Sequence, residues 1–196
     1  MRSARWTNVA ILGISLIAFG FSLPLAVSLF ANAGPASEGF GLRGQVDMVL
    51  YDKSGQVKDE RHLDNLIVNT GIEGVASRIA PHDGSVNPSS PYNYIALGTG
   101  STAADKAQTT LVSELPTGVS YARINDSTAQ YVTAAGNKLI LSVTFPPGQA
   151  TGTLRESGLF NAATGGDMLA RQTFTDIQKA SGDTLTVTWT ITLSST

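Results

Sequence analysis

The sequence contains no cysteine and only two histidines, His62 and His82, among its 196 residues. Without thiols the chain can form no disulfide, no thiolate zinc site and no cysteine nucleophile. The two histidines lie in polar surroundings and far apart in the sequence, which is a poor arrangement for a metal site, so we expect them at the surface. These shortages exclude most catalytic and metal-binding arrangements.

Charge is scarce as well. Charged residues make up 14% of the chain, against about 25% in an average globular protein. The 13 basic and 15 acidic residues form no basic cluster, which argues against nucleic acid as a partner. Apolar residues reach 42%, so a largely disordered chain is also excluded. The length corresponds to about one domain.

The N-terminal segment indicates where the protein resides. Residues 9–30 are a run of 22 apolar or uncharged residues, preceded by Arg2 and Arg5 and followed by a small-residue site that ends at Ala33. This order is typical of a secretory signal peptide cleaved after Ala33. A signal core usually has about 7–15 residues, and a helix of this length crosses a bilayer. An uncleaved membrane anchor is therefore the first alternative, and a pilin-like stem the second.

All three interpretations place the rest of the chain outside the cytoplasm, either secreted, at the cell surface or on a virion. Membrane contact is expected only through residues 9–30, as a hydrophobic helix, if they are not cleaved. The next segment, 34–44, is rich in glycine and is expected to be a flexible linker or an exchange segment. The sequence thus divides into 1–33, 34–44 and a β domain at 45–196.

The domain at 45–196 begins with an alternating strand. Val46, Met48 and Leu50 fall on one face of residues 45–51, and a turn at 52–55 predicts a hairpin. The final strand is the clearest. Its apolar residues alternate with a row of threonines, and they are Leu185, Val187, Trp189, Ile191 and Leu193.

One helix is expected in the domain, over residues 70–80. Ile72, Val75, Ala76 and Ile79 have the spacing of one buried helix face, and Asn69 or Thr70 is placed to cap the N-terminus. The other strands are expected at short intervals between glycine and proline turns. This pattern predicts a mainly β fold, an antiparallel β-sandwich of the jelly-roll or Ig-like kind with one short helix.

Few residues of the sequence are candidates for catalysis or ligand binding. Glu156 lies within an apolar strand, and Arg171 and Lys179 lie where they can reach it. Acid–base catalysis needs a second positioned titratable group, whereas a buried charge is usually paired. We therefore interpret Glu156 with Arg171 or Lys179 as a buried ion pair, and predict no catalytic residues, no cofactor and no metal.

Several stretches of the domain resemble a recurring domain of phage-type tail and fibre proteins. They are YDKSG at 51–55, NLIVNTG at 65–71, YIALGTG at 94–100, ATG at 150–152, ESGLF at 156–160, MLAR at 168–171 and the final threonine-rich strand. The resemblance implies a structural or adhesive domain without an established active site. The chain departs from that family in its secretory N-terminus, which favours a cell-surface appendage or an envelope-associated virus protein.

The leading functional prediction is a non-enzymatic subunit of an extracellular filament, pilus or fibre. Copies would assemble by β-strand complementation, in which an extended segment at 34–51 completes a sheet edge of the next copy. Val46, Met48 and Leu50 are then the candidate subunit contacts, unless they pair within their own chain through the turn at 52–55. The alternatives are a surface adhesin that binds a host glycan or receptor, and a membrane-anchored virion protein.

Overall fold

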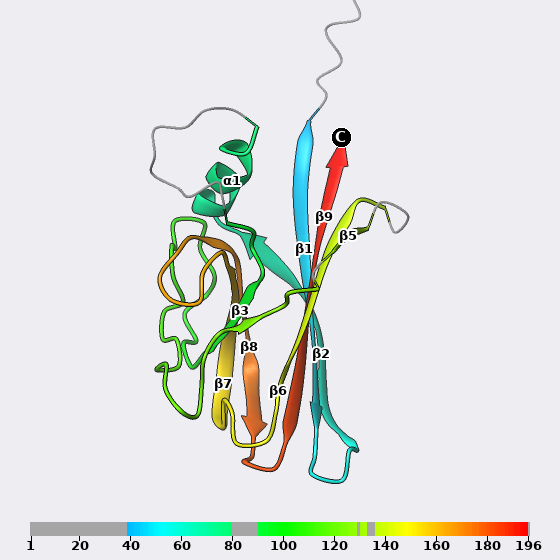
Figure 1. Ribbon diagram of the computed structural model, residues 1–196, viewed down its shortest axis with the longest axis vertical. Helices are drawn as coiled ribbons and strands as arrows, with labels where there is room; N and C mark the ends of the chain where they lie inside the picture. The colour runs from blue at the N-terminus through cyan, green and yellow to red at the C-terminus, as the bar shows by residue number, and fades with distance from the viewer. Residues whose placement is uncertain (1–38, 80–89, 129, 133–135, 196) are drawn as a thin grey trace, which may run out of the picture. The chain divides into compact units, whose positions relative to one another are not determined.

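The computed structural model describes residues 39–79, 90–128, 130–132 and 136–195 (Figure 1). The predicted signal peptide or anchor at 1–33, its hydrophobic helix and the first part of the expected linker lie outside the described residues. Among the described residues, no helix combines the length and the apolar character needed to cross a membrane.

The described chain is mainly β, with one short helix, as predicted. In chain order the elements are β1 (Phe40–Tyr51), β2 (Val57–Ile67), α1 (Asn69–Ala76), β3 (Tyr94–Gly98), β4 (Ile124–Asn125), β5 (Gln130–Val132), β6 (Lys138–Phe145), β7 (Gly152–Phe160), β8 (Met168–Lys179) and β9 (Thr184–Ser195). Apolar alternation explains most of these strands, because it places one row of side chains in the core.

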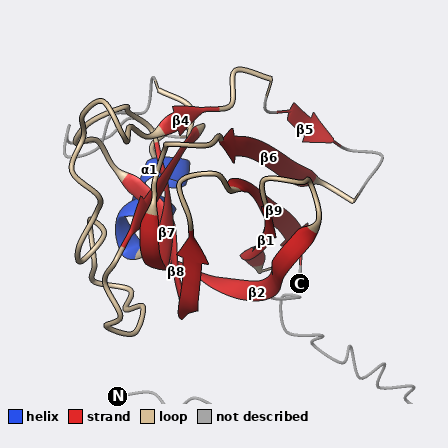
Figure 2. Cartoon of the chain, turned by 90° about the horizontal axis from the view of Figure 1, so that it is seen from below, coloured by secondary structure: helices blue, strands red, loops and turns tan. Residues whose placement is uncertain are grey.

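The strands hydrogen-bond in a single order, β4-β3-β7-β8-β2-β1-β9-β6-β5, and every neighbouring pair is antiparallel. Seen from its end, the sheet curls round on itself (Figure 2). The backbone N–H of Ser142 in β6 donates to Asp126, which follows β4, at 2.7 Å, so a side chain links the β4 end of the sheet to the next-to-last strand at the other end. The fold is barrel-like, with one nearly closed sheet.

The prediction of a sandwich specified two sheets, whereas β2 connects both halves of this sheet. Its residues up to Asn65 pair with β1, and Leu66 and Ile67 then pair with β8. A strand that passes from one layer to the other in this way turns two stacked layers into one continuous sheet. The alternation that predicts the strands does not reveal such a corner.

The core lies between the two halves of the sheet. Leu185, Val187 and Trp189 of β9 have no exposed surface, and they pack with apolar residues of β1, β6, β7 and β8. Trp189 is the largest of the fully buried side chains. Its Nε1 donates to Ser157 Oγ of β7 at 3.3 Å, and Ser157 Oγ donates to the Ala96 carbonyl of β3 at 2.9 Å. One polar contact therefore crosses the core and ties β9 to the opposite strands.

The first strand starts earlier than expected. β1 begins at Phe40, inside the segment expected to be a linker, and its residues from Phe40 to Tyr51 pair with β9 in one unbroken register. Phe40 and Leu42 continue the alternation of Val46, Met48 and Leu50, which explains the extension. The turn at 52–55 forms the predicted hairpin with β2, and Asp52 accepts hydrogen bonds from the amides of Ser54 and Gln56.

A helix forms where the sequence places it, although it ends at Ala76, and only Val75 of its expected buried face packs against the core. α1 packs through Gly71 and Gly74, which are buried, whereas Ile72 and Ile79 are 49% and 80% exposed. A Cβ at Gly71 would lie 2.3 Å from the Leu169 carbonyl oxygen of β8, so close packing against that strand requires glycine. Val68 rather than Asn69 or Thr70 is the N-cap, without a side-chain hydrogen bond. Apart from Val75, the apolar face expected of the helix is therefore left open.

Candidate functional site

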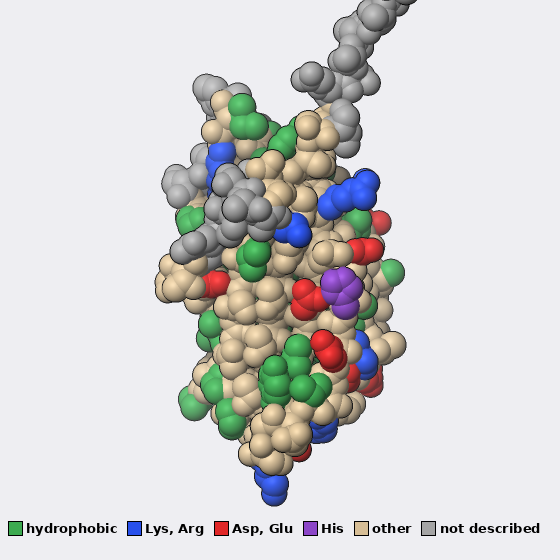
Figure 3. Space-filling view, turned by 90° about the vertical axis from the view of Figure 1, so that its right-hand side faces the viewer, with side chains coloured by type: hydrophobic (Ala, Val, Ile, Leu, Met, Phe, Trp, Pro, Cys, Tyr) green, Lys and Arg blue, Asp and Glu red, His purple; other side chains and the backbone are tan. Residues whose placement is uncertain are grey.

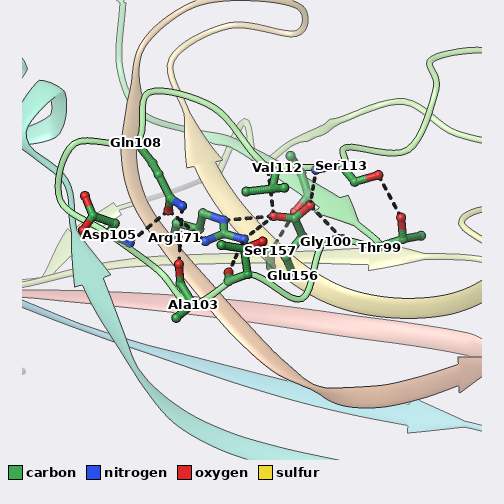
Figure 4. Close-up of polar contacts among 12 residues, drawn as sticks. Thr99, Gly100, Ala103, Asp105, Gln108, Val112, Ser113, Glu156, Ser157 and Arg171 are labelled. Atoms are coloured by element: carbon green, nitrogen blue, oxygen red, sulfur yellow. Dashed lines mark hydrogen bonds and ion pairs between the residues drawn. The ribbon is translucent and has the colours of Figure 1, made fainter.

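Glu156 and Arg171 form an ion pair in the interior, across the neighbouring strands β7 and β8 (Figure 4). Both side chains have no exposed surface, and Arg171 Nη2 lies 2.7 Å from Glu156 Oε2. The Arg171 Nε also donates to Glu156 Oε2, at 2.9 Å. Of the three candidates for a buried ion pair, the structure brings these two together.

The remaining contacts of this pair go to the loop that follows β3. Glu156 accepts hydrogen bonds from the backbone amides of Gly100, Val112 and Ser113, at 3.0, 3.0 and 2.7 Å. Arg171 donates to the Thr102 carbonyl and to Gln108 Oε1, at 2.9 and 2.8 Å. Each charge is thus satisfied by groups that hold the loop in place. The arrangement anchors the loop and leaves no oxygen of Glu156 open to a substrate.

Lys179 does not join this pair. At the other end of β8 its Nζ donates to the carbonyl oxygens of Pro146 and Asp183, at 3.0 and 2.6 Å. Burial lowers the pKa of Lys179. The Asp183 carboxylate accepts from Lys58 Nζ at 2.6 Å and from the Ala180 amide at 2.9 Å. Lys179 therefore fixes the turn between β8 and β9.

The same turn gives the domain a predicted sensitivity to acid. Hydrogen bonds from Lys58 and Ala180 hold the pKa of Asp183 below its ordinary value of 3.8. A lowered pKa contributes stability at higher pH, and this contribution is lost as the pH falls through the folded-state pKa. We expect the unfolding free energy to fall less between about pH 5 and about pH 2 in Asp183→Asn than in the natural protein. Urea unfolding at a series of pH values measures this, and equal pH dependence of the two proteins would contradict it.

Val46, Met48 and Leu50, the candidate subunit contacts, lie in the core of their own chain. They are 0%, 1% and 1% exposed, and the strand that carries them lies between β2 and β9. The alternative from the sequence, pairing within the chain through the turn at 52–55, is the arrangement that the structure has. In this arrangement the three side chains are covered by their own chain.

The N-terminal end of the same strand is different. β2 pairs with β1 only from Gly44 onward, whereas β9 pairs with β1 from Phe40. Among the described strands, residues 40–43 therefore have a partner on one side only. Figure 1 shows β1 and β9 extending side by side beyond their neighbours, with α1 across from β1. Within the described part of the chain, the backbone of residues 40–43 is thus an unpaired sheet edge.

An apolar groove lies along this edge. One cavity of about 190 Å³ is lined by Phe40 and Leu42 of β1, by Ile67, by Ile72, Val75 and Ala76 of α1, and by Ile79 in the turn that follows the helix. A second, of about 260 Å³, shares Leu42 and Val75 and reaches Leu139, Ile191 and Leu193. Phe40 itself is 62% exposed. We call these two cavities and the edge at residues 40–43 the β1 groove.

A cavity of about 410 Å³, lined by polar as well as apolar residues, adjoins the groove at the point where β2 leaves β1. It is lined by Leu42, Arg43, Gly44, Asp64, Asn65, Leu66, Ile67, Ile72 and Lys106. The Asn65 side chain lies against Gly44, where a Cβ would meet Asn65 Oδ1 at 2.0 Å. Both polar atoms of the Asn65 amide are buried and have no hydrogen-bond partner among the described residues. Buried amides normally form hydrogen bonds, so the Asn65 amide is suited to bind a further polar group.

Sequence reasoning missed the β1 groove, although two signals for it exist. Phe40 and Leu42 extend an alternating pattern into the glycine-rich segment, and the apolar face of α1 is readable as a pattern. What the pattern does not show is that β2 leaves β1 after Asn65 and that the helix packs through its glycines. Groups of three or more acidic or histidine side chains able to hold a metal do not occur within the described ranges.

Comparisons with protein-family models, with curated proteins and with solved structures gave no match. The resemblance to phage-type tail and fibre domains therefore depends on the short stretches quoted above.

Proposed function

We propose that this protein is a non-enzymatic structural subunit of an extracellular filament, pilus or fibre, and that its copies join by β-strand complementation at the β1 groove. The observation that carries the proposal is the edge at residues 40–43, which no other described strand pairs on its β2 side and which has exposed apolar side chains beside it. An incoming extended segment gains backbone hydrogen bonds from the edge and burial of its side chains from the groove. Residues 45–51, already paired on both sides, are not the donor in this form of the proposal.

The long outer edge of β2 is less suited to pairing with another chain, which supports the choice of the edge at residues 40–43. Six of the eleven residues of β2 are charged or titratable, and they are Lys58, Asp59, Glu60, Arg61, His62 and Asp64. Arg61 and Asp59 pair at 2.8 Å and are only partly exposed. Figure 3 shows acidic, basic and histidine side chains close together on one flank of the molecule. Charged and inward-pointing residues are the usual protection of an edge against pairing with another chain, and residues 40–43 carry only Arg43.

We include in this proposal the secretory N-terminus, the sandwich relationship and the resemblance to tail and fibre domains that the sequence predicts. A secretory N-terminus would deliver the domain outside the cytoplasm. The two halves of the sheet enclose one core as the layers of a sandwich do, which supports an Ig-like or jelly-roll relationship and the resemblance to tail and fibre domains. An adhesive module and an anchored virion protein are the competing functions, and the experiment below separates self-assembly from both.

We expect Phe40→Lys to weaken self-association of the full chain by at least about tenfold. Burying one large apolar side chain is worth about 1.5–3 kcal/mol, and a factor of ten corresponds to about 1.4 kcal/mol. Because Phe40 is 62% exposed, the variant should fold normally. Sedimentation velocity over a concentration series gives the association constant, and negative-stain microscopy shows whether filaments form.

The matched control is Val119→Lys, because Val119 is fully exposed and lies in a loop outside the groove. We expect Val119→Lys to assemble like the natural protein. Equal loss in both variants would mean that added charge alone is responsible and would overturn the proposal. So would a natural chain that stays monomeric at every concentration, whether it binds glycans, receptors or lipid vesicles.

A further inference from the structure

We infer that Asn125 is a site of N-linked glycosylation. This inference rests on the secretory N-terminus of the proposed function, because such glycans are attached outside the cytoplasm. Asn125, Asp126 and Ser127 form the acceptor motif, in which serine or threonine stands two residues after asparagine and the middle residue is not proline. No other asparagine of the sequence meets both conditions.

The fold exposes the two side chains that define the motif. Asn125 and Ser127 are exposed, whereas Asp126 between them is 8% exposed. The Asp126 carboxylate accepts from the backbone amide of Thr128 at 2.8 Å and from that of Ser142 at 2.7 Å. The middle residue is thus tied to the domain, and the residues on either side of it are left accessible to a modifying enzyme.

The place of Asn125 in the sheet allows a bulky group to be attached. Asn125 is the last residue of β4, the strand at one end of the sheet (Figure 2). Ile124 packs against the core, so the next residue along the strand points away from it. The Asn125 side-chain oxygen accepts from Asn93 Nδ2 at 3.4 Å. Its Nδ2, the atom to which a glycan is joined, has no partner among the described residues.

The modification is a group transfer from a lipid-linked oligosaccharide, catalysed by a separate transferase. The Asn125 Nδ2 attacks the anomeric carbon of the first sugar and forms the new C–N bond. The bond from that carbon to the lipid phosphate oxygen breaks, and its electron pair leaves with the phosphate. One proton of the amide passes to a base of the transferase. The products are glycosylated Asn125 and the lipid phosphate.

A glycan at this position also bears on assembly. The end strand of an open sheet is normally protected against pairing with other chains. A bulky, hydrated glycan at the end of β4 provides such protection. The edge at residues 40–43 contains no asparagine, so the proposed assembly edge carries no acceptor.

Mass spectrometry of the natural full-length protein, isolated from its own cells or particles, tests the inference. We expect the mass to exceed that of the polypeptide, and we expect the excess to lie on the peptide that contains Asn125. Fragmentation of that peptide should release sugar ions. An unmodified Asn125 peptide in the natural protein would overturn the inference.

Variants of the full chain, expressed with the natural N-terminus in the same cells, test the motif itself. We expect Asn125→Gln and Ser127→Ala to lose the added mass completely and Ser127→Thr to keep it, because threonine retains the hydroxyl. Ser127 is exposed, so Ser127→Ala should fold normally. The matched control is Asn69→Gln, since Asn69 is exposed but has Gly71 two residues later. Retention of the glycan in Ser127→Ala, or its loss in Asn69→Gln, would contradict the inference.

The outcome can be separated from that of the proposed function. If the natural chain self-associates through Phe40 and Asn125 is unmodified, this inference fails and the proposed function stands. If Asn125 is glycosylated and the chain stays monomeric at every concentration, the proposed function fails and the modification site stands. A chain that is both unmodified and monomeric would overturn both.

Discussion

Replacing Arg171 with leucine is expected to lower the unfolding free energy by about 3–5 kcal/mol, because it leaves the fully buried carboxylate of Glu156 without its cation. The pair has no exposed surface, so water cannot compensate for the lost guanidinium. The loop loses the contacts to Thr102 and Gln108 in the same step. Urea unfolding followed by far-UV circular dichroism measures the difference.

The adjacent ion pair provides a matched control. Arg155 contacts Asp176 across the same two strands, at 2.7 and 3.1 Å, but the two side chains are 37% and 48% exposed. Water screens an exposed pair, which therefore contributes little to stability, so Arg155→Leu should be nearly neutral. Similar losses in Arg155→Leu and Arg171→Leu would show that burial does not govern the effect and would contradict the assignment.

The double variant Glu156→Leu with Arg171→Leu should not recover stability. Many buried pairs can be exchanged for apolar residues at little cost. Here Glu156 is the acceptor for the backbone amides of Gly100, Val112 and Ser113. Leaving a buried donor unsatisfied costs about 1–3 kcal/mol. The pair is therefore held in place by the loop amides as much as by its own attraction.

Trp189→Ala is expected to cost about 3–5 kcal/mol, the range for truncating a large buried aromatic side chain. Trp189 is fully buried between the two halves of the sheet, and the contact from its Nε1 to Ser157 Oγ spans the core. Removing the indole leaves a cavity and breaks that link. The variant is measured by urea unfolding at neutral pH, with circular dichroism as the signal because the main fluorophore of the domain is lost.

The conservative variant Trp189→Phe separates packing from hydrogen bonding. It retains an aromatic ring and loses the Nε1 donor, while Ser157 Oγ still donates to the Ala96 carbonyl. We expect a cost clearly smaller than that of Trp189→Ala. A loss below about 1 kcal/mol for Trp189→Ala, the size of an average substitution, would show that this side chain is not central to the core.

The strands could be predicted from the sequence because alternation reports directly on one buried face. β6 and β7 lie between glycine and proline turns, as expected, and the threonine-rich strand is β9. The helix α1 was predictable as a helix but not in its orientation. Periodicity favours burial of Ile72 and Ile79, whereas the tertiary contact is made by Gly71, which permits the closest approach to β8. An apolar stripe shows that one face of a helix tends to be buried, but it does not show which element buries that face.

The candidate site was predictable only in part, for a similar reason. Glu156 and Arg171 were recognisable as charges in apolar strands, but most of their partners in the loop are backbone groups that no sequence pattern marks. The β1 groove depends on the corner after Asn65, where β2 exchanges one neighbour for another. That corner is set by packing of the whole sheet, so the unpaired edge at residues 40–43 emerges only from the three-dimensional arrangement.

The way in which Glu156 binds the loop has an evolutionary consequence. All three of its loop contacts are to main-chain amides, which every residue except proline possesses. Between these fixed points the outward side chains, among them Thr109 and Thr110, take no part in the anchoring and are exposed. Mutations there can accumulate without loosening the loop. The domain thus carries a rigidly mounted surface whose chemistry is free to diversify while the scaffold beneath it stays constant.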